Sequence, residues 1–309
     1  MNHTASLAAS ITKTGSRQTY YTFRLLSDHD RLEDSYRAYA YFRWLDDCFD
    51  EGGLPKAERS RLLKRQQSIL KACYRGETVG DVNQEEGMLV DLVQKDPDQH
   101  SGLHAYLHNM MAVLAFDAER RGRLISQKEL DQYTQWLACS VTEVLHYMIG
   151  HDSFSPQDDT RYLAVSAAHI THMLRDTYED TQAGYFNIPL EVLEENHITP
   201  MDITSDAYRA WVRGRVGLAR NYFLKGRNYM QRVASARCRL AGYAYMARFE
   251  WLLDTFEKEG FYLRPAYDER KSLLKGWQMS WQALTALLRT NKHTMLVLPK
   301  STSDPEERL

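Results

Sequence analysis

The stretch from residue 36 to residue 51, YRAYAYFRWLDDCFDE, places acidic side chains directly after an aromatic and apolar run. In a helix, residues three and four positions apart share a face, so Arg43 shares a stripe with Asp46 or Asp47. Asp50 continues this stripe one turn further. The apolar context indicates a buried face, where a carboxylate is costly without a partner. The stretch therefore predicts a helix that presents a ladder of carboxylates to the interior.

A second acidic cluster, RDTYED at residues 175–180, repeats this geometry. Asp176 and Asp180 lie four residues apart and follow the apolar run LAVSAAHITHML. Two facing ladders would suit Mg²⁺, which prefers a few carboxylates plus the oxygens of phosphate and water. The alternative is that each cluster is a solvated helix face with local arginine–carboxylate pairs. The apolar context of both clusters favours metal-assisted chemistry on a diphosphate.

The remaining pattern predicts an all-α fold. Apolar residues recur at spacings of three and four, and the 309-residue chain contains only 8 prolines and 16 glycines. We expect one domain over residues 1–309, with flexible tails at 1–15 and 300–309 and an irregular break at 183–204. Helices are expected over 29–50, 56–75, 85–95, 99–122, 127–150, 158–182, 205–233, 236–259 and 267–290.

Composition excludes several classes of protein. The 39 basic and 41 acidic side chains nearly cancel, so no global field favours nucleic acid. The four cysteines form no CxxC pair, which favours reduced thiols and a cytoplasmic location. No apolar run reaches the roughly 18 residues of a transmembrane helix. Transient membrane association and the oligomeric state stay open.

Four motifs occur in the order seen in the squalene/phytoene synthase family, which this chain resembles over most of residues 16–260. They are SRQTYYTFRLL (16–26), YRAYAYFRWLDDCFDE (36–51), YTQWLACSVTEVL (133–145) and HMLRDTYEDTQAGYFNIP (172–189). The resemblance implies a single-domain isoprenoid synthase bundle, with the two acidic motifs on opposite walls of a central cavity.

The resemblance also implies the reaction of the family. Two farnesyl or geranylgeranyl diphosphates condense head to head, through a cyclopropylcarbinyl diphosphate, to a squalene-, dehydrosqualene- or phytoene-type product. Mg²⁺ is the implied cofactor. The use of NADPH stays undecided, because no Gly-rich dinucleotide loop is present and family members that use NADPH lack one as well.

Site residues follow from the same motifs. The metal-binding residues would be Asp46, Asp50, Asp176 and Asp180. The catalytic residues would be Tyr39, Tyr133, Arg43 and Arg175, the arginines because their donor fork matches phosphate oxygens. The substrate-binding residues would be Ser16, Arg17, Tyr20, Tyr21, Asp47, His169, His172 and Glu179. Each tyrosine could instead be an aromatic anchor whose hydroxyl bonds to a neighbouring helix.

Two histidines depart from the family pattern. Family members usually carry glutamine and asparagine before the second acidic motif, where this chain has His169 and His172. His172 shares a helical face with Asp176, so its imidazole could bind diphosphate or tether a metal-binding carboxylate. Thr142 and Phe249 replace a glycine and a tyrosine of the family, which leaves the product open.

Two other functions remain open at this point. A class I terpene synthase or a head-to-tail prenyltransferase would also use metal and diphosphate in a helical cavity. A family member without catalysis could instead serve as an assembly or lipid-binding factor. The intact acidic residues in both motifs argue against the loss of catalysis.

Overall fold

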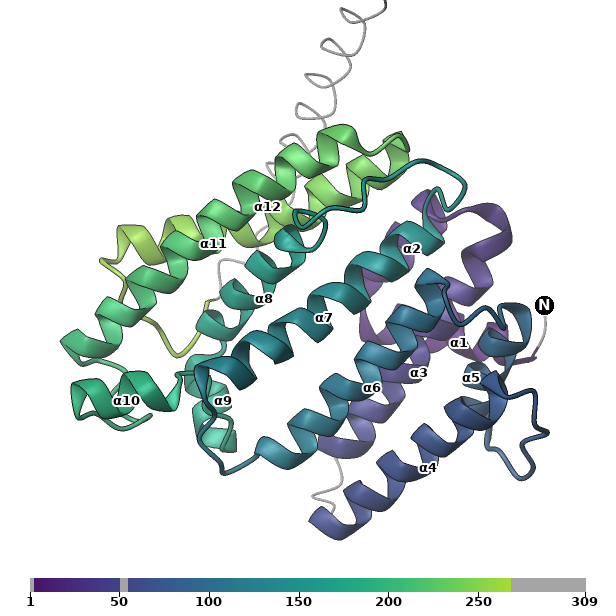
Figure 1. Cartoon of the computed structure of the whole chain (residues 1–309), viewed down its shortest axis with the longest axis horizontal. Coiled ribbons are helices and arrows are strands. Elements are labelled where there is room, and N and C mark those ends of the chain that lie inside the picture. The colour runs from purple at the N-terminus through teal and green to yellow at the C-terminus, as the bar shows by residue number, and fades with distance from the viewer. Residues whose placement is uncertain (1–2, 51–54, 268–309) are drawn as a thin grey trace, which may run out of the picture.

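The computed structural model describes residues 3–50 and 55–267, and this part of the chain is helical, with no strand (Figure 1). The all-α prediction is confirmed. The helices are α1 (His3–Gly15), α2 (Arg17–Leu26), the short 3₁₀ helix η1 (His29–Arg31), α3 (Leu32–Asp50), α4 (Lys56–Tyr74), α5 (Gln84–Lys95), α6 (Gly102–Arg120), α7 (Gln127–Met148), α8 (Leu163–Arg175), α9 (Thr177–Ala183), α10 (Leu190–Asn196), α11 (Asp206–Arg232) and α12 (Ala236–Lys258).

The long helices run roughly along one direction around a shared apolar core (Figure 1). Most of them begin close to the expected residue because a side chain caps the first turn. Ser126 at the start of α7 and Asn83 at the start of α5 each form a reciprocal capping box with a glutamate. None of the described helices combines the length and apolar character that a membrane span needs. The helix expected over 267–290 and the tail at 300–309 lie outside the described residues.

The flexible tail expected over residues 1–15 is wrong for residues 3–15, which form α1 against α3. The buried residues of α1 are small and lie at helical spacing: Ala5, Ala8 and Thr12. The buried guanidinium of Arg37 on α3 donates to the hydroxyl of Thr4 at 3.1 Å. Small side chains give a weak hydrophobic signal in sequence, although they allow a close helix–helix contact.

The helix expected over residues 158–182 is interrupted at Asp176, which separates α8 from α9. The hydroxyl of Thr177 donates to the carbonyl oxygens of Met173 (3.0 Å) and Leu174 (3.1 Å). Such back-bonding competes with the backbone ladder and bends helices. The apolar periodicity continues across the bend, so the pattern alone predicts a single helix.

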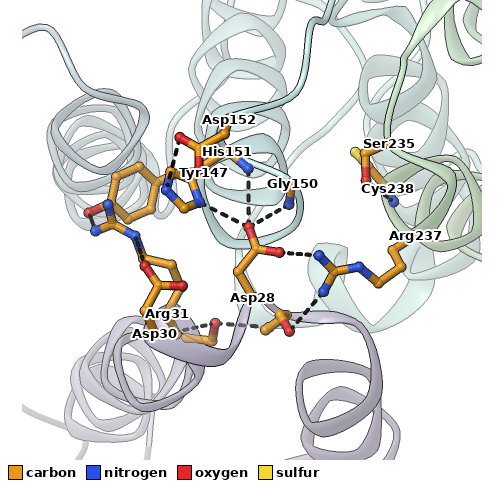
Figure 2. Close-up of polar contacts among 12 residues, drawn as sticks. Asp28, Asp30, Arg31, Tyr147, Gly150, His151, Asp152, Ser235, Arg237 and Cys238 are labelled. Carbon is orange, nitrogen blue, oxygen red and sulfur yellow. Dashed lines mark hydrogen bonds and ion pairs between the residues drawn. The ribbon is translucent and has the colours of Figure 1, made fainter.

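Asp28 joins the N-terminal helices to the end of α7 and the start of α12 (Figure 2). Its Oδ2 accepts hydrogen bonds from the backbone N–H groups of Gly150 (2.7 Å) and His151 (3.1 Å), and its Oδ1 pairs with Arg237. Burial alone would raise the pKa of Asp28, but the bonds from His151, Gly150 and Arg237 outweigh burial and hold the pKa below its ordinary value. Arg237 also donates to the carbonyl oxygen of Leu26 at 3.1 Å, at the end of α2.

A buried polar network connects α7 and α11 through Arg161, which lies in the segment just before α8. Arg161 forms a two-pronged ion pair with Glu143 (2.7 and 2.8 Å) and donates to the hydroxyl of Tyr229 at 2.8 Å. The same hydroxyl lies 2.9 Å from Nε2 of His146. Burial, and after it the charge of Arg161, lowers the pKa of His146 from 6.5 to about 4. His146 is therefore neutral at physiological pH.

We expect His146→Gln to remove part of the pH dependence of unfolding. Because folding lowers the pKa of His146 to about 4, the unfolded chain binds the proton more tightly. The free energy of unfolding therefore falls as the pH drops from about 6.5 toward 4, by about 2 kcal/mol between pH 7 and pH 5 for this one histidine. Urea unfolding at both pH values measures this difference.

The matched control for this experiment is His100→Gln, because His100 is exposed. This control should keep the pH dependence of the wild-type protein. An equal loss of stability in wild type and His146→Gln would show that His146 is not held neutral.

Candidate active site

A cavity of about 340 Å³ opens among α3, α4, α6, α7, α8 and α9. Both acidic motifs reach it, the first through Asp46 and the second through Asp176 and Asp180. Its remaining lining comprises two arginines, one further carboxylate, two histidines and a set of aromatic and apolar residues: Arg59, Arg120, Asp117, His169, His172, Phe49, Leu114, Ala118, Tyr133, Met173 and Tyr185. The cavity thus combines acidic side chains from both motifs with basic, polar, aromatic and apolar side chains.

The first acidic motif lies on the last two turns of α3. Nη2 of Arg43 lies 2.5 Å from Oδ1 of Asp47, and Nη1 lies 4.0 Å from Oδ2 of Asp46. Burial raises the pKa of Tyr39, one turn earlier, while Arg43 and the hydroxyl of Ser16 lower it. The structure thus brings Ser16 beside Tyr39 and Arg43. The side chain of Asp50, the last residue of α3, lies outside the described part of the chain.

The second acidic motif lies at the bend between α8 and α9. Nε and Nη2 of Arg175 donate to Oδ1 and Oδ2 of Asp176, each at 2.5 Å. Nε2 of His172 lies 2.5 Å from Nη2 of Arg175 and 3.3 Å from Oδ2 of Asp176. His172 therefore belongs to the polar cluster of this motif.

Asp180 is a partly buried carboxylate of the cavity with a raised pKa. Burial raises its pKa to about 6, the charges of Asp176 and Asp117 act in the same direction, and a hydrogen bond from Asn187 and the charge of Arg120 oppose them. Nδ2 of Asn187 donates to Oδ2 of Asp180 at 2.6 Å. Gathered carboxylates of this kind fit a cation, which would favour their ionised form.

Protein side chains alone do not form a metal cage in the described part of the chain. No three histidine, cysteine, aspartate or glutamate side chains there lie close enough together to hold a metal ion. A bound Mg²⁺ would need further oxygens from water or from substrate phosphates, which is its usual coordination in phosphate chemistry.

The sequence analysis missed a buried chain of contacts that ends at Asp180. The hydroxyl of Tyr133 donates to Oδ2 of Asp117 at 2.9 Å, and Nε of Arg120 donates to Oδ1 of Asp117 at 2.7 Å. Nη1 of Arg120 then donates to Oδ1 of Asn187 at 2.8 Å, and Asn187 donates to Asp180. This chain orients Asp180 through Asn187. It also gives the hydroxyl of Tyr133 a carboxylate partner.

Arg59 and Tyr185 were also missed. Arg59 is 9% exposed and lines the cavity from α4, and its Nε has no hydrogen-bond partner. The guanidinium of Arg120 lies 5.1 Å from the ring centre of Tyr185 and 4.8 Å from that of Tyr133. For Arg120, the only sequence signal was the charged motif AERRGR (118–123), and such a motif is also typical of a solvated helix end.

Several expected substrate-binding residues do not line the cavity. Tyr20 stacks on Tyr36 at 5.1 Å, with 16° between the ring planes, and Tyr21 is 51% exposed. Arg17 and Glu179 are exposed and lie outside the cavity lining. Their assignment to substrate therefore stays a prediction.

His169 lies deep in the cavity wall. Its Nδ1 is 3.2 Å from the hydroxyl oxygen of Thr134, and its ring meets that of Tyr133 edge-on at 5.0 Å. Burial, followed by the charges of His172, Arg120 and Arg215, lowers the pKa of His169 to about 3. The imidazole of His169 is therefore neutral at physiological pH.

Comparison with solved structures defines the class of protein through its fold. Squalene synthase HpnC from Alicyclobacillus acidocaldarius aligns with a TM-score of 0.68 at 17% identity, over 84% of this chain and 95% of that one. A dehydrosqualene synthase in complex with ligand aligns with a TM-score of 0.69 at 17% identity, over 95% and 97%. The chain has the helical fold of these synthases.

The family is shown by sequence. The model of the squalene/phytoene synthase family matches residues 12–278, so the chain belongs to this family of prenyltransferases. The presqualene diphosphate synthase of Zymomonas mobilis subsp. mobilis is 27% identical over 63% of this chain, and the 15-cis-phytoene synthase of Synechocystis sp. is 24% identical over 67%. The chain spans 63% of the length of each of these two relatives.

We expect Arg120→Met to destabilise the protein by about 3 kcal/mol, because the buried guanidinium compensates the Asp117 carboxylate and its loss removes that counter-charge. Urea unfolding at pH 7 measures the loss. The double variant Asp117→Asn/Arg120→Met should recover part of it, since the carboxylate is then absent as well. A double variant less stable than Arg120→Met would contradict this account of the pair.

Proposed function

We propose that this protein condenses two allylic prenyl diphosphates head to head, with release of diphosphate. The observation that carries the proposal is the meeting of Asp46, Asp176 and Asp180, from two motifs far apart in the chain, in one cavity with an aromatic and apolar lining. Membership of the squalene/phytoene synthase family supports the same reaction class. The substrates would be farnesyl or geranylgeranyl diphosphate.

Mg²⁺ is the proposed cofactor. When bound at the aspartates, it would neutralise negative charge on the diphosphate as the C–O bond breaks. Asp46, Asp176 and Asp180 would hold it, together with Asp50, and Arg43 and Arg175 would bind phosphate oxygens. The use of NADPH stays undecided.

The chain's own residues would bind and shield the reacting carbons. Ionisation leaves an allylic cation, which needs a pocket that excludes water and offers aromatic faces. Phe49, Tyr133 and Tyr185 supply aromatic rings to the cavity wall. Because its hydroxyl is held by Asp117, Tyr133 would keep a fixed orientation toward the substrate.

Two alternatives would share the cavity and the metal. A class I terpene synthase would cyclise one prenyl diphosphate, and a head-to-tail prenyltransferase would add a C5 unit. A family member without catalysis would release no diphosphate from any of these substrates. We propose a cytoplasmic location, since the four cysteines of the sequence form no CxxC pair, with transient membrane contact left open for an apolar product.

Incubation with C15 and C20 diphosphates, followed by mass spectrometry, separates these functions. We expect a C30 or C40 product, or the corresponding cyclopropylcarbinyl diphosphate, in the presence of Mg²⁺ and none in excess EDTA. A cyclic product from a single substrate would favour the terpene synthase. Full turnover in excess EDTA would contradict the proposed dependence on Mg²⁺.

We expect Asp180→Asn to lower turnover by about two orders of magnitude or more while the protein stays folded. Asparagine keeps the shape of the side chain and can still accept a hydrogen bond from Asn187, but it cannot contribute charge to a metal site. Steady-state rates and thermal unfolding should be measured on the same preparation.

The matched control is Asp159→Asn, because Asp159 is exposed and lies outside the cavity lining. This variant should stay near the wild-type rate. Near wild-type turnover of Asp180→Asn would exclude Asp180 from the site.

A further inference from the structure

A second cavity, of about 530 Å³, lies outside the candidate active site between α7, α8 and α11. Its volume falls in the range of small-molecule binding sites. Its apolar and aromatic wall is formed by Ala138, Tyr162, Leu163, Ile170, Leu218 and Tyr222. The polar and charged residues that complete the lining are Gln127, Asp131, Thr134, Gln135, Ser166 and Arg215.

The cavity is built into the packing of α8 against α11. At Gly226 the two helices touch, and a Cβ atom there would come within 2.7 Å of the Cβ atom of Ala164. The wall residue Tyr222 lies one turn before this contact, and Arg215 lies two further turns toward the start of α11. The space is therefore bounded by packed helices on three sides.

Arg215 brings a positive charge into this wall, and Asp131, which lines the same cavity, is the carboxylate that acts on it. No described residue forms a hydrogen bond or an ion pair with its guanidinium. Burial lowers the pKa of Arg215 below its ordinary value, and the more distant Asp131 and Tyr222 offset this only in part. Asp131 is exposed and accepts a hydrogen bond from Gln127 at 2.7 Å. The side chain of Arg215 is only partly exposed, so its guanidinium loses part of its hydration without gaining a direct partner, and an anion in the cavity would supply one.

Four other arginines of α11 form ion pairs, which is the usual arrangement of a structural arginine. Each of four has a carboxylate partner within 3.0 Å in the described part of the chain: Arg209 with Asp206, Arg220 with Asp254 and Glu257, Arg227 with Glu250, and Arg232 with Asp158. Arg215 differs from these four arginines because it lines a cavity and has no carboxylate within that distance in the described part of the chain.

We propose that this second cavity binds a small molecule that carries one phosphate or carboxylate group, with the anion on Arg215 and an apolar body against Leu218 and the two tyrosines. The guanidinium fork matches both anions, because its parallel N–H groups meet two oxygens at once. The aromatic and aliphatic wall accommodates the rest of the molecule.

The second cavity shares a wall with the candidate active site. Thr134 lines the second cavity, and its hydroxyl oxygen lies 3.2 Å from Nδ1 of His169, which lines the first. A molecule bound at Arg215 would therefore lie next to a residue that holds His169. The proposal stands apart from the proposed reaction, and its test uses stability instead of turnover.

The test is thermal unfolding of the whole protein with inorganic phosphate or hexanoate, at constant ionic strength set with chloride. We expect either anion to raise the Tm of the wild-type protein by about 2–4 °C when it saturates the site. Arg215→Met should lose this rise and should unfold, without added anion, at a temperature no lower than wild type, because methionine fills similar space without a buried charge. A purely structural arginine would instead leave Arg215→Met less stable.

Two further variants make the result specific. Lys225→Met, an exposed charge on the same helix, should keep the full rise. Leu218→Trp narrows the cavity while Arg215 stays in place, so this variant should lose the rise in Tm on addition of anion. If Arg215→Met does not fold, the Leu218→Trp variant tests the proposal in its place. The proposal is overturned if neither anion shifts the wild-type Tm, or if the rise is the same in wild type as in Arg215→Met or Leu218→Trp, since the anions then bind elsewhere.

Discussion

The carboxylates of Asp117, Asp176 and Asp180 meet around one partly buried cavity, and the compensation of their charge is the constraint on which the site depends. Arg120 compensates Asp117 and Arg175 compensates Asp176, each at hydrogen-bond distance. Asp180 accepts a hydrogen bond from the amide of Asn187, and burial raises its pKa to about 6 although the charge of Arg120 opposes this. Among the described contacts of these three carboxylates, that of Asp180 has no arginine at hydrogen-bond distance, so an added cation would favour its ionised form.

This arrangement requires the chain to turn sharply after the second motif. The four-residue step survives the bend at Asp176, because the N–H of Asp180 still donates to the carbonyl oxygen of Asp176 at 2.8 Å. Gly184 then ends α9 with φ at 85°, which favours glycine, and its carbonyl oxygen accepts a bond of 2.7 Å from the N–H of Gly122. This bond joins the end of α9 to the end of α6, so that Asn187 reaches Arg120. The loop after the motif therefore supports the site as much as the motif does.

The sequence predicts those parts of the molecule that depend on local pattern. Helical periodicity and capping residues locate the long helices, and the spacing of Asp46, Asp176 and Asp180 predicts their shared cavity. It does not distinguish Arg120 or Arg215 from the many exposed arginines, because both lie in charged runs typical of a solvated helix face. Only the tertiary structure distinguishes these two arginines from the exposed ones. Arg120 lies between two tyrosine rings, and Arg215 lies in a cavity wall. The bend at Asp176 depends in the same way on where one hydroxyl, that of Thr177, finds its acceptors.

His169 and His172, where the resemblance to the family implies a glutamine and an asparagine, have different surroundings in the structure. His169 is buried and neutral, since its pKa is lowered to about 3, so it offers hydrogen-bonding atoms without charge, as a glutamine would. A charged ring there would add a cation beside Arg120 and Arg215, which burial opposes. His172 is 49% exposed and contacts both Arg175 and Asp176, so it enters the charge pairing of the second motif. A neutral imidazole at position 169 therefore adds no charge to the cavity wall, whereas the imidazole of His172 contacts both charged partners of the ion pair between Arg175 and Asp176.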